Sequence, residues 1–164
     1  MNDKLTSSAI AFLLAIIDQA YDHKSWHGTN LRGAIRGLSA KTAAWRPNPK
    51  RHNIWEIVTH AAYWKYAVRR RLLGEARGSF PLKGSNWFVR PQELTEAAWK
   101  ADVKLLEDMH QVLRTAVAGL APGRLREIPA GSKLDNFTVL TGIAAHDLYH
   151  AGQIQLLKRL AERR

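Results

Sequence analysis

The chain has 164 residues, a length that suits one hydrophobic core, and we predict a single domain over residues 1–164. It contains no cysteine, which excludes disulfides, cysteine-ligated zinc and a cysteine nucleophile, so a metal site would have to use His, Asp or Glu. The formal charge of +11 is compatible with a nucleic-acid partner, a membrane surface or anionic substrates, but also with a surface that is simply basic.

The longest apolar run covers residues 9–17. It is too short to cross a bilayer, and the residues before it lack the positive charge of a secretory leader. We therefore interpret the run as one face of a buried helix and expect a cytoplasmic protein without membrane contact.

Helical periodicity begins at residues 6–23. The apolar stripe that we expect this helix to bury consists of Ala9, Phe12, Ile16 and Ala20. Two short helical pieces are predicted next, at residues 31–38 and 39–46, although glycines weaken the first of them.

The second long helix has clear boundaries in the sequence. Asn53 is a suitable N-cap, and Glu56 stands three residues later, as a capping box requires. Gly74 stands where a helix commonly ends in a left-handed residue. These signals predict a helix between Asn53 and Gly74.

Two further long helices are predicted at residues 95–119 and 137–163, the last ending in basic residues that suit the negative end of the helix dipole. Between the second and third long helices, residues 78–91 contain three aromatic side chains. We expect this segment to pack over one mouth of the bundle as a lid. No strand-like alternation is present, so the predicted fold class is all-α, a four-helix bundle.

Three histidines lie on the predicted core stripes. His146 and His150 are four residues apart, so they lie one turn apart on one face of the last helix, and His60 lies on the apolar stripe of the second. Because metal sites in bundles use side chains of facing helices, the three imidazoles could bind one divalent ion and leave a position open. Alternatively, each is a separate core histidine with its own hydrogen bond, and spacing alone does not decide.

The other histidines have less defined roles. His110 also lies on an apolar stripe and could be a fourth ligand, a partner of a ligand or a packed histidine, of which we favour the last. His23, His27 and His52 fall at helix ends or in loops, where we expect them to be solvated.

The segments that hold the three histidines resemble the DinB/YfiT-like metalloprotein superfamily. The similar segments are HAAYW at 60–64, RRRLLG at 69–74, HDLYHAGQI at 146–154, WHGTNL at 26–31 and WRP at 45–47. The resemblance covers nearly the whole chain and implies a four-helix bundle, usually a homodimer, that binds zinc, nickel or a similar divalent ion through His60, His146 and His150. Characterised members of the family it resembles include metal-dependent thiol transferases and a thiol-dependent isomerase.

An ion held by three neutral imidazoles keeps its full charge and can acidify a water or a thiol in the open position. Since the chain has no cysteine, a transferred thiol would have to be a low-molecular-weight cofactor thiol, and the excess of Lys and Arg would suit an anionic one. We therefore expect a metal-dependent thiol transferase acting on a small-molecule substrate. A metal-dependent hydrolase and a basic non-enzymatic binding module are the alternatives.

The hydrolase alternative rests on residues 146–150, which have the spacing of a metalloprotease signature with Asp147 in place of the catalytic Glu. We favour an Asp147 that orients a ligand histidine or forms a surface pair. Gln153 lies one turn beyond His150 and could contact substrate or make a plain hydrogen bond within the bundle.

The binding-module alternative rests on basic residues that could contact phosphates, namely Lys65, Arg69, Arg70 and Arg71. No nucleic-acid-binding motif is present, and the basic residues are spread over several helices. We therefore do not expect a nucleic-acid partner.

Overall fold

The computed structural model describes the backbone of residues 2–162 and the side chains of residues 9–162 apart from position 122. Over this range the chain forms α-helices and one 3-10 turn, without strands. The long helices are α1 (Asn2–Tyr21), α4 (Ile54–Leu73), α5 (Glu96–Ala118) and α6 (Asn136–Glu162). The short elements are α2 (Leu31–Ile35), α3 (Ala40–Ala44) and η1 (Pro122–Arg126).

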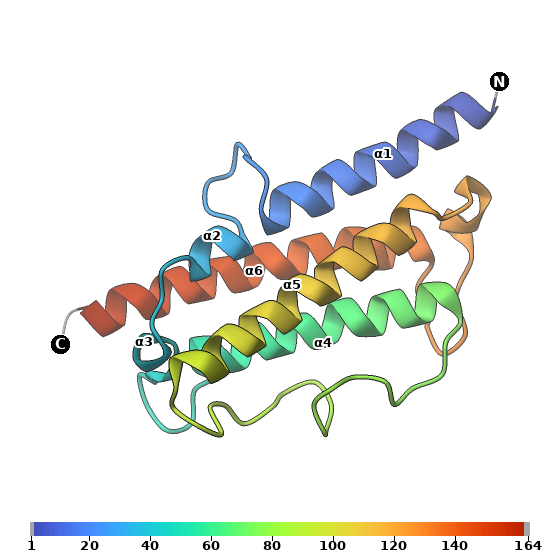
Figure 1. Cartoon of the computed structure of the whole chain (residues 1–164). Coiled ribbons are helices and arrows are strands. Elements are labelled where there is room, and N and C mark those ends of the chain that lie inside the picture. Colours follow the sequence, from blue (N-terminus) through green and yellow to red (C-terminus); the bar gives the residue numbers. More distant parts are fainter. Residues whose placement is uncertain (1, 163–164) are drawn as a thin grey trace.

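The four long helices form the predicted bundle (Figure 1). α5 and α6 each pack against both α1 and α4, so the core lies between two pairs of facing helices. The predicted all-α class and four-helix architecture are confirmed. No helix in the described range is both long enough and apolar enough to cross a membrane. Arg163 and Arg164, which belonged to the predicted end of the last helix, lie outside the described residues.

α4 begins and ends where the sequence predicts. The Asn53 side chain accepts a hydrogen bond from the backbone N–H of Glu56 at 2.7 Å, and Gly74 closes the helix with φ of +71°. The capping box itself is only half formed. Instead of returning to Asn53, the Glu56 carboxylate binds the side chains of Arg46 and His52.

The prediction of the buried face of α1 was wrong in part. Of the expected stripe, Ala20 is buried, but Phe12 is 69% exposed and Ile16 is 48% exposed. The side chains of α1 that enter the core are Ile10, Leu13, Ile17, Ala20 and Tyr21. Both sets follow helical spacing because α1 is apolar on more than one face, so periodicity could not decide between them.

The short helices are shorter than predicted. α2 ends at Ile35, and Gly37 then adopts φ of +72°, a left-handed conformation that turns the chain out of the helix. α3 ends at Ala44, two residues before the predicted limit. The extended backbone of Trp45 leads into the proline-containing segment that follows.

The aromatic segment 78–91 runs back along α4 instead of covering an end of the bundle (Figure 1). Ser79 donates to the hydroxyl of Tyr66 near the C-terminal end of α4, and Asn53, just before α4, donates to the carbonyl of Arg90. The rings of Phe80 and Phe88 pack near Tyr63, with centroids 5.4 and 5.8 Å away. These contacts hold the segment against the side of α4 that carries His60.

Candidate metal centre

The structure brings His60, His146 and His150 together at one point in the bundle. The Nε2 atom of His146 lies 3.1 Å from Nε2 of His60 and 3.1 Å from Nε2 of His150. Ligand atoms of all three lie within 4.8 Å of one another. In the described part of the chain, no other set of three His, Asp or Glu residues converges in this way.

Hydrogen bonds fix the tautomers of two of these rings. Nδ1 of His60 lies 2.7 Å from the backbone oxygen of Asn86, and Nδ1 of His150 lies 2.7 Å from Oε1 of Gln153. Because these oxygens can only accept, each Nδ1 carries the proton. The Nε2 lone pairs of His60 and His150 are therefore directed at the centre, as metal ligands require.

The His146 ring cannot supply a hydrogen-bond donor to both of the lone pairs that face it. His146 can donate its Nε2 hydrogen to only one of the two neighbouring lone pairs, and its buried Nδ1 has no hydrogen-bond partner among the described residues. A tetrahedral ion with Zn–N distances of ~2.0–2.1 Å separates its ligand nitrogens by about 3.3 Å. The observed separations of 3.1 Å are close to that value, so the donor set fits a divalent cation.

The environment keeps the imidazoles neutral. Burial is the largest cause that lowers the pKa of His60 to about 4 and that of His146 to about 3, and it also lowers the pKa of His150. Neutral imidazole is the form that coordinates metals. The site is therefore in its ligand form near pH 7 before any cation binds.

Asn86 occupies a special position in the wall of this site. Its φ of +66° lies in the left-handed region, which few residues other than glycine adopt. In this conformation its backbone oxygen accepts from His60, while its side-chain oxygen accepts from Nε1 of Trp64 at 2.9 Å. One residue thus fixes both the His60 ring and the neighbouring indole.

Trp87 is stacked between two histidines. Its ring lies 3.7 Å from the ring of His52 and 3.8 Å from that of His60, with interplanar angles of 2° and 11°. The His52 ring is exposed to solvent, as predicted, and it also contacts the Glu56 carboxylate at 2.9 Å. His23 and His27 are exposed, as predicted.

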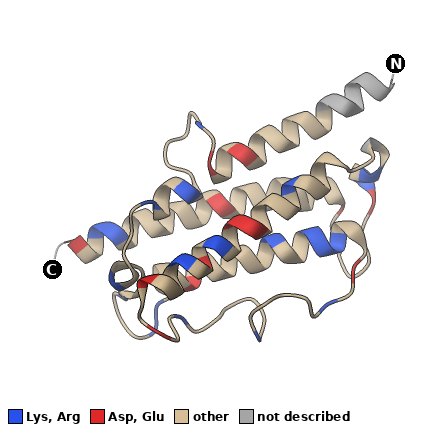
Figure 2. Cartoon of the chain, viewed as in Figure 1, with Lys and Arg blue, Asp and Glu red and all other residues tan. Residues whose placement is uncertain are grey.

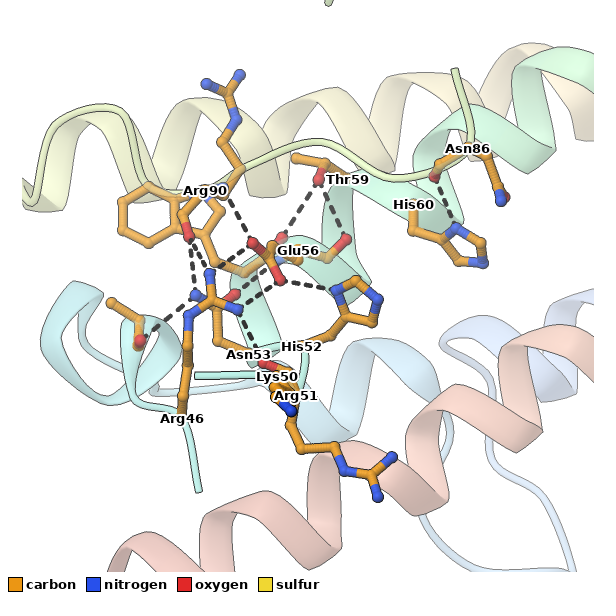
Figure 3. A network of polar contacts seen from close by, with 12 residues as sticks. Arg46, Lys50, Arg51, His52, Asn53, Glu56, Thr59, His60, Asn86 and Arg90 are labelled. Carbon is orange, nitrogen blue, oxygen red and sulfur yellow. Dashed lines mark hydrogen bonds and ion pairs between the residues drawn. The ribbon is translucent and has the colours of Figure 1, made fainter. Parts of the chain in front are cut away.

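A polar network beside the site anchors the segment that carries Asn86 and Trp87 (Figure 3). At its centre the Glu56 carboxylate accepts from the Arg46 guanidinium and from the backbone N–H of Arg90. Burial is the largest single influence on the Glu56 carboxyl group and raises its pKa. The hydrogen bonds from Arg46 and His52 together outweigh burial, so the pKa of Glu56 is lowered overall. The network is therefore ionic, and it ties the end of the segment to α4.

A family model described as DinB superfamily matches residues 24–154, which include all three histidines and most of the chain. The chain belongs to the DinB superfamily. No curated protein matches it, and no solved structure matches it.

In this DinB superfamily protein, Asp147 neither orients a ligand histidine nor forms a surface pair. Its carboxylate is fully buried and binds the ammonium group of Lys65, which is fully buried too. Both expectations for Asp147 were therefore wrong, and so was the placement of Lys65 among the phosphate-contacting cations. The sequence did not reveal this pair, because Lys65 and Asp147 lie on different helices and each is a single charge within an amphipathic pattern.

His110 is a packed histidine, as favoured from the sequence. It is 1% exposed and stacks on Tyr21 with ring centroids 3.7 Å apart. Burial is the main cause that lowers its pKa to about 2, and the charges of Lys65 and Arg114 add to this effect. It is not a member of the converging histidine group.

A cavity of about 440 Å³ adjoins the histidine cluster of the DinB fold at His150. Leucines of α6 and polar groups of the loop before α4 contribute to its lining, among them Leu156, Leu157, Leu160, Arg51 and His52. Gln153 both lines this cavity and holds His150. Sequence reasoning did not identify Asn86 and Trp87, and their only signal was the unusual aromatic content of segment 78–91.

Proposed function

We propose that this protein binds a divalent metal ion, zinc or nickel, through His60, His146 and His150. The observation that carries the proposal is the convergence of three Nε2 atoms, two of them held as acceptors by bonds on Nδ1. A bound ion would receive three neutral ligands and keep its charge and an open position, which gives it the Lewis acidity to activate a thiol.

We further propose that the reaction is transfer of a low-molecular-weight thiol to a small electrophilic substrate. The chain holds no cysteine, so the thiol must come from a second molecule. The cavity beside His150 offers about 440 Å³ for substrate, with leucines for an apolar part and Arg51 at its wall for an anionic part. Trp87 covers one face of His60 and so limits contact of that ligand with water.

The alternatives have weaker support in the geometry. The general base that the sequence offered for hydrolysis is Asp147, and its carboxylate is enclosed with Lys65. The basic binding module is weakened too, because Lys65, one of its proposed phosphate contacts, is fully buried. We therefore retain the thiol transferase as the proposed activity.

The metal proposal is tested by elemental analysis of the purified protein. We expect about one zinc or nickel ion per chain in the wild type and in the exposed control His27→Ala, and strongly reduced occupancy in His60→Ala and His150→Ala. Circular dichroism checks that each variant is folded. Absence of stoichiometric metal in the wild type, or full occupancy in either ligand variant, would refute the proposal.

The transferase proposal is tested separately with metal-loaded protein. Glutathione, cysteine and coenzyme A are each offered with 1-chloro-2,4-dinitrobenzene, whose carbon–chlorine bond breaks as the carbon–sulfur bond forms; chloride leaves and the thiol proton passes to solvent. We expect conjugation with at least one thiol that is faster than with metal-free protein. No enhancement with any of the three would overturn the transferase while leaving the metal proposal intact.

We also propose that the protein is a homodimer that covers the exposed apolar side of α1. Phe12 and Ile16 are 69% and 48% exposed there, and a second copy would remove this surface from water. Sedimentation equilibrium should give a dimer for the wild type and a monomer for the Phe12→Ser/Ile16→Ser variant. A monomeric wild type would contradict the proposal.

A further inference from the structure

A second cavity, whose lining includes none of the three histidines, lies between the C-terminal half of α4 and the segment that follows it. Its volume is about 510 Å³. The residues that line it fall into two groups. The aromatic group is Tyr63, Trp64, Tyr66 and Phe80, and the basic group is Arg70, Arg71, Arg77 and Lys83.

The aromatic group forms a fixed apolar wall. Tyr66 is only 6% exposed, and its ring lies 5.3 Å from the ring of Phe80. Both the backbone and the side chain of Ser79 donate to the Tyr66 hydroxyl, at 3.3 and 3.2 Å. Tyr63 packs edge-on against Phe80 at 5.4 Å. The nearly buried Tyr66 ring is therefore fixed behind the wall, and a planar group can stack on the partly exposed rings of Tyr63, Trp64 or Phe80.

The basic group has no carboxylate within the cavity to balance it. No Asp or Glu lines the cavity, and the nearby Glu75 carboxylate is occupied by two hydrogen bonds of 2.7 Å from Arg69. In the described chain, the side chains of Arg71, Arg77 and Lys83 have no hydrogen-bond or ion-pair partner. Figure 2 shows Lys and Arg gathered at this end of α4 and along the segment after it.

The helix dipole explains only part of this charge. Basic residues in the last turn of a helix are favoured by its negative end, which accounts for Arg70 and Arg71. Arg77 and Lys83 lie outside the helix, yet the following segment brings them to the same cavity. Four cations around one concave surface attract anions, and guanidinium groups match phosphate oxygens in paired hydrogen bonds.

We propose that this cavity binds a phosphorylated small molecule with a planar ring, of the nucleotide class. The phosphates contact Arg71 and Arg77, and the ring stacks on the aromatic wall beside Phe80. The site is distinct from the proposed metal centre because it uses none of the three histidines.

The proposal is tested by isothermal titration calorimetry with ADP, pyrophosphate and adenosine, at about 50 mM and about 200 mM salt. We expect ADP to bind most tightly, because it alone offers both the ring and two phosphates, and to bind more weakly at the higher salt. Phe80→Leu should weaken ADP but leave pyrophosphate unchanged. The absence of saturable ADP binding by the wild type at low salt would overturn the proposal.

Two double variants distinguish a specific binding site in the cavity from a nonspecific effect of the protein's positive charge on ADP affinity. Arg71→Glu/Arg77→Glu should weaken ADP at least about tenfold, because two phosphate contacts are lost and reversed in sign. Lys100→Glu/Arg159→Glu makes the same change of charge at exposed positions that do not line the cavity, and should change ADP affinity less than about twofold. Equal losses in the two variants would refute the site.

A further variant separates this site from the metal centre. His150→Ala removes a proposed metal ligand and should leave ADP binding intact. If His150→Ala abolishes ADP binding while Arg71→Glu/Arg77→Glu preserves it, the phosphates bind at the histidines and the second site does not exist. The two proposals can thus fail independently. Absence of ADP binding would not contradict stoichiometric metal in the wild type, and absence of metal would not contradict ADP binding.

Discussion

Lys65 and Asp147 form an ion pair that is completely enclosed between α4 and α6, with side-chain exposures of 0% and 1%. The pair acts electrostatically on the histidine cluster, because the positive charge of Lys65 is among the influences that lower the pKa of His146, after burial and the two neighbouring histidines. A buried pair of this kind contributes little net stability, but breaking it leaves a charge without compensation.

Loss of one partner of this pair should therefore be severe. Lys65→Met is expected to lower the free energy of unfolding by about 3–5 kcal/mol, because Asp147 remains buried without its cation. The double variant Lys65→Met/Asp147→Leu should recover most of that loss. Urea denaturation measures both, and a Lys65→Met protein as stable as the wild type would show that the pair is not enclosed in solution.

Gln153 should influence metal affinity without being a ligand. Gln153→Leu removes the acceptor that holds Nδ1 of His150, and removal of such a partner weakens metal binding by about 10–100-fold. Competition with a chromophoric chelator gives the affinity. Gln155→Leu, two residues further on the same helix, is the matched control and should retain wild-type affinity; an equal effect of the two changes would argue against an orienting role.

Two substitutions at Asn86 distinguish its backbone conformation from its side chain. Asn86→Gly keeps the left-handed backbone and the carbonyl that accepts from His60, so metal affinity should stay near the wild-type value. Asn86→Ala strains this conformation by about 1 kcal/mol and should weaken metal binding more than the glycine variant. The same chelator competition measures both, and the opposite order of affinities would exclude the backbone as the cause.

His110 should make the protein sensitive to acid. Its pKa is lowered by burial to about 2 in the folded chain, whereas an unfolded histidine has a pKa of about 6.5. Between these values the unfolded chain binds a proton that the folded chain does not, so stability falls as the pH decreases below about 6.5. This histidine alone contributes a slope of about 1.4 kcal/mol per pH unit.

His110→Leu should remove that contribution. Chemical denaturation of metal-free protein between about pH 6.5 and pH 4 should show a shallower loss of stability for this variant than for the wild type. His27→Gln, at an exposed position, serves as the control and should retain the wild-type slope. Parallel slopes for His110→Leu and the wild type would show that His110 is accessible to protons in the folded state.

The sequence by itself determined those features that depend on residues close together in the chain. The caps of α4 at Asn53 and Gly74 were predicted because each acts within one helical turn. The candidate histidines were found because helical spacing places them on core stripes, and the similarity of their segments to the DinB superfamily connected the two helices. The family match confirms the resemblance, and the three rings converge in the structure, while their role as metal ligands stays a prediction.

Only the tertiary structure decided which partner each of these side chains meets. α1 is apolar on more than one side, so its core face depends on how it packs against α5 and α6. Lys65 meets Asp147 across 82 positions, and Asn86 meets His60 across 26. Such contacts leave no periodic signal, because they arise where separate elements happen to face each other once the core has formed.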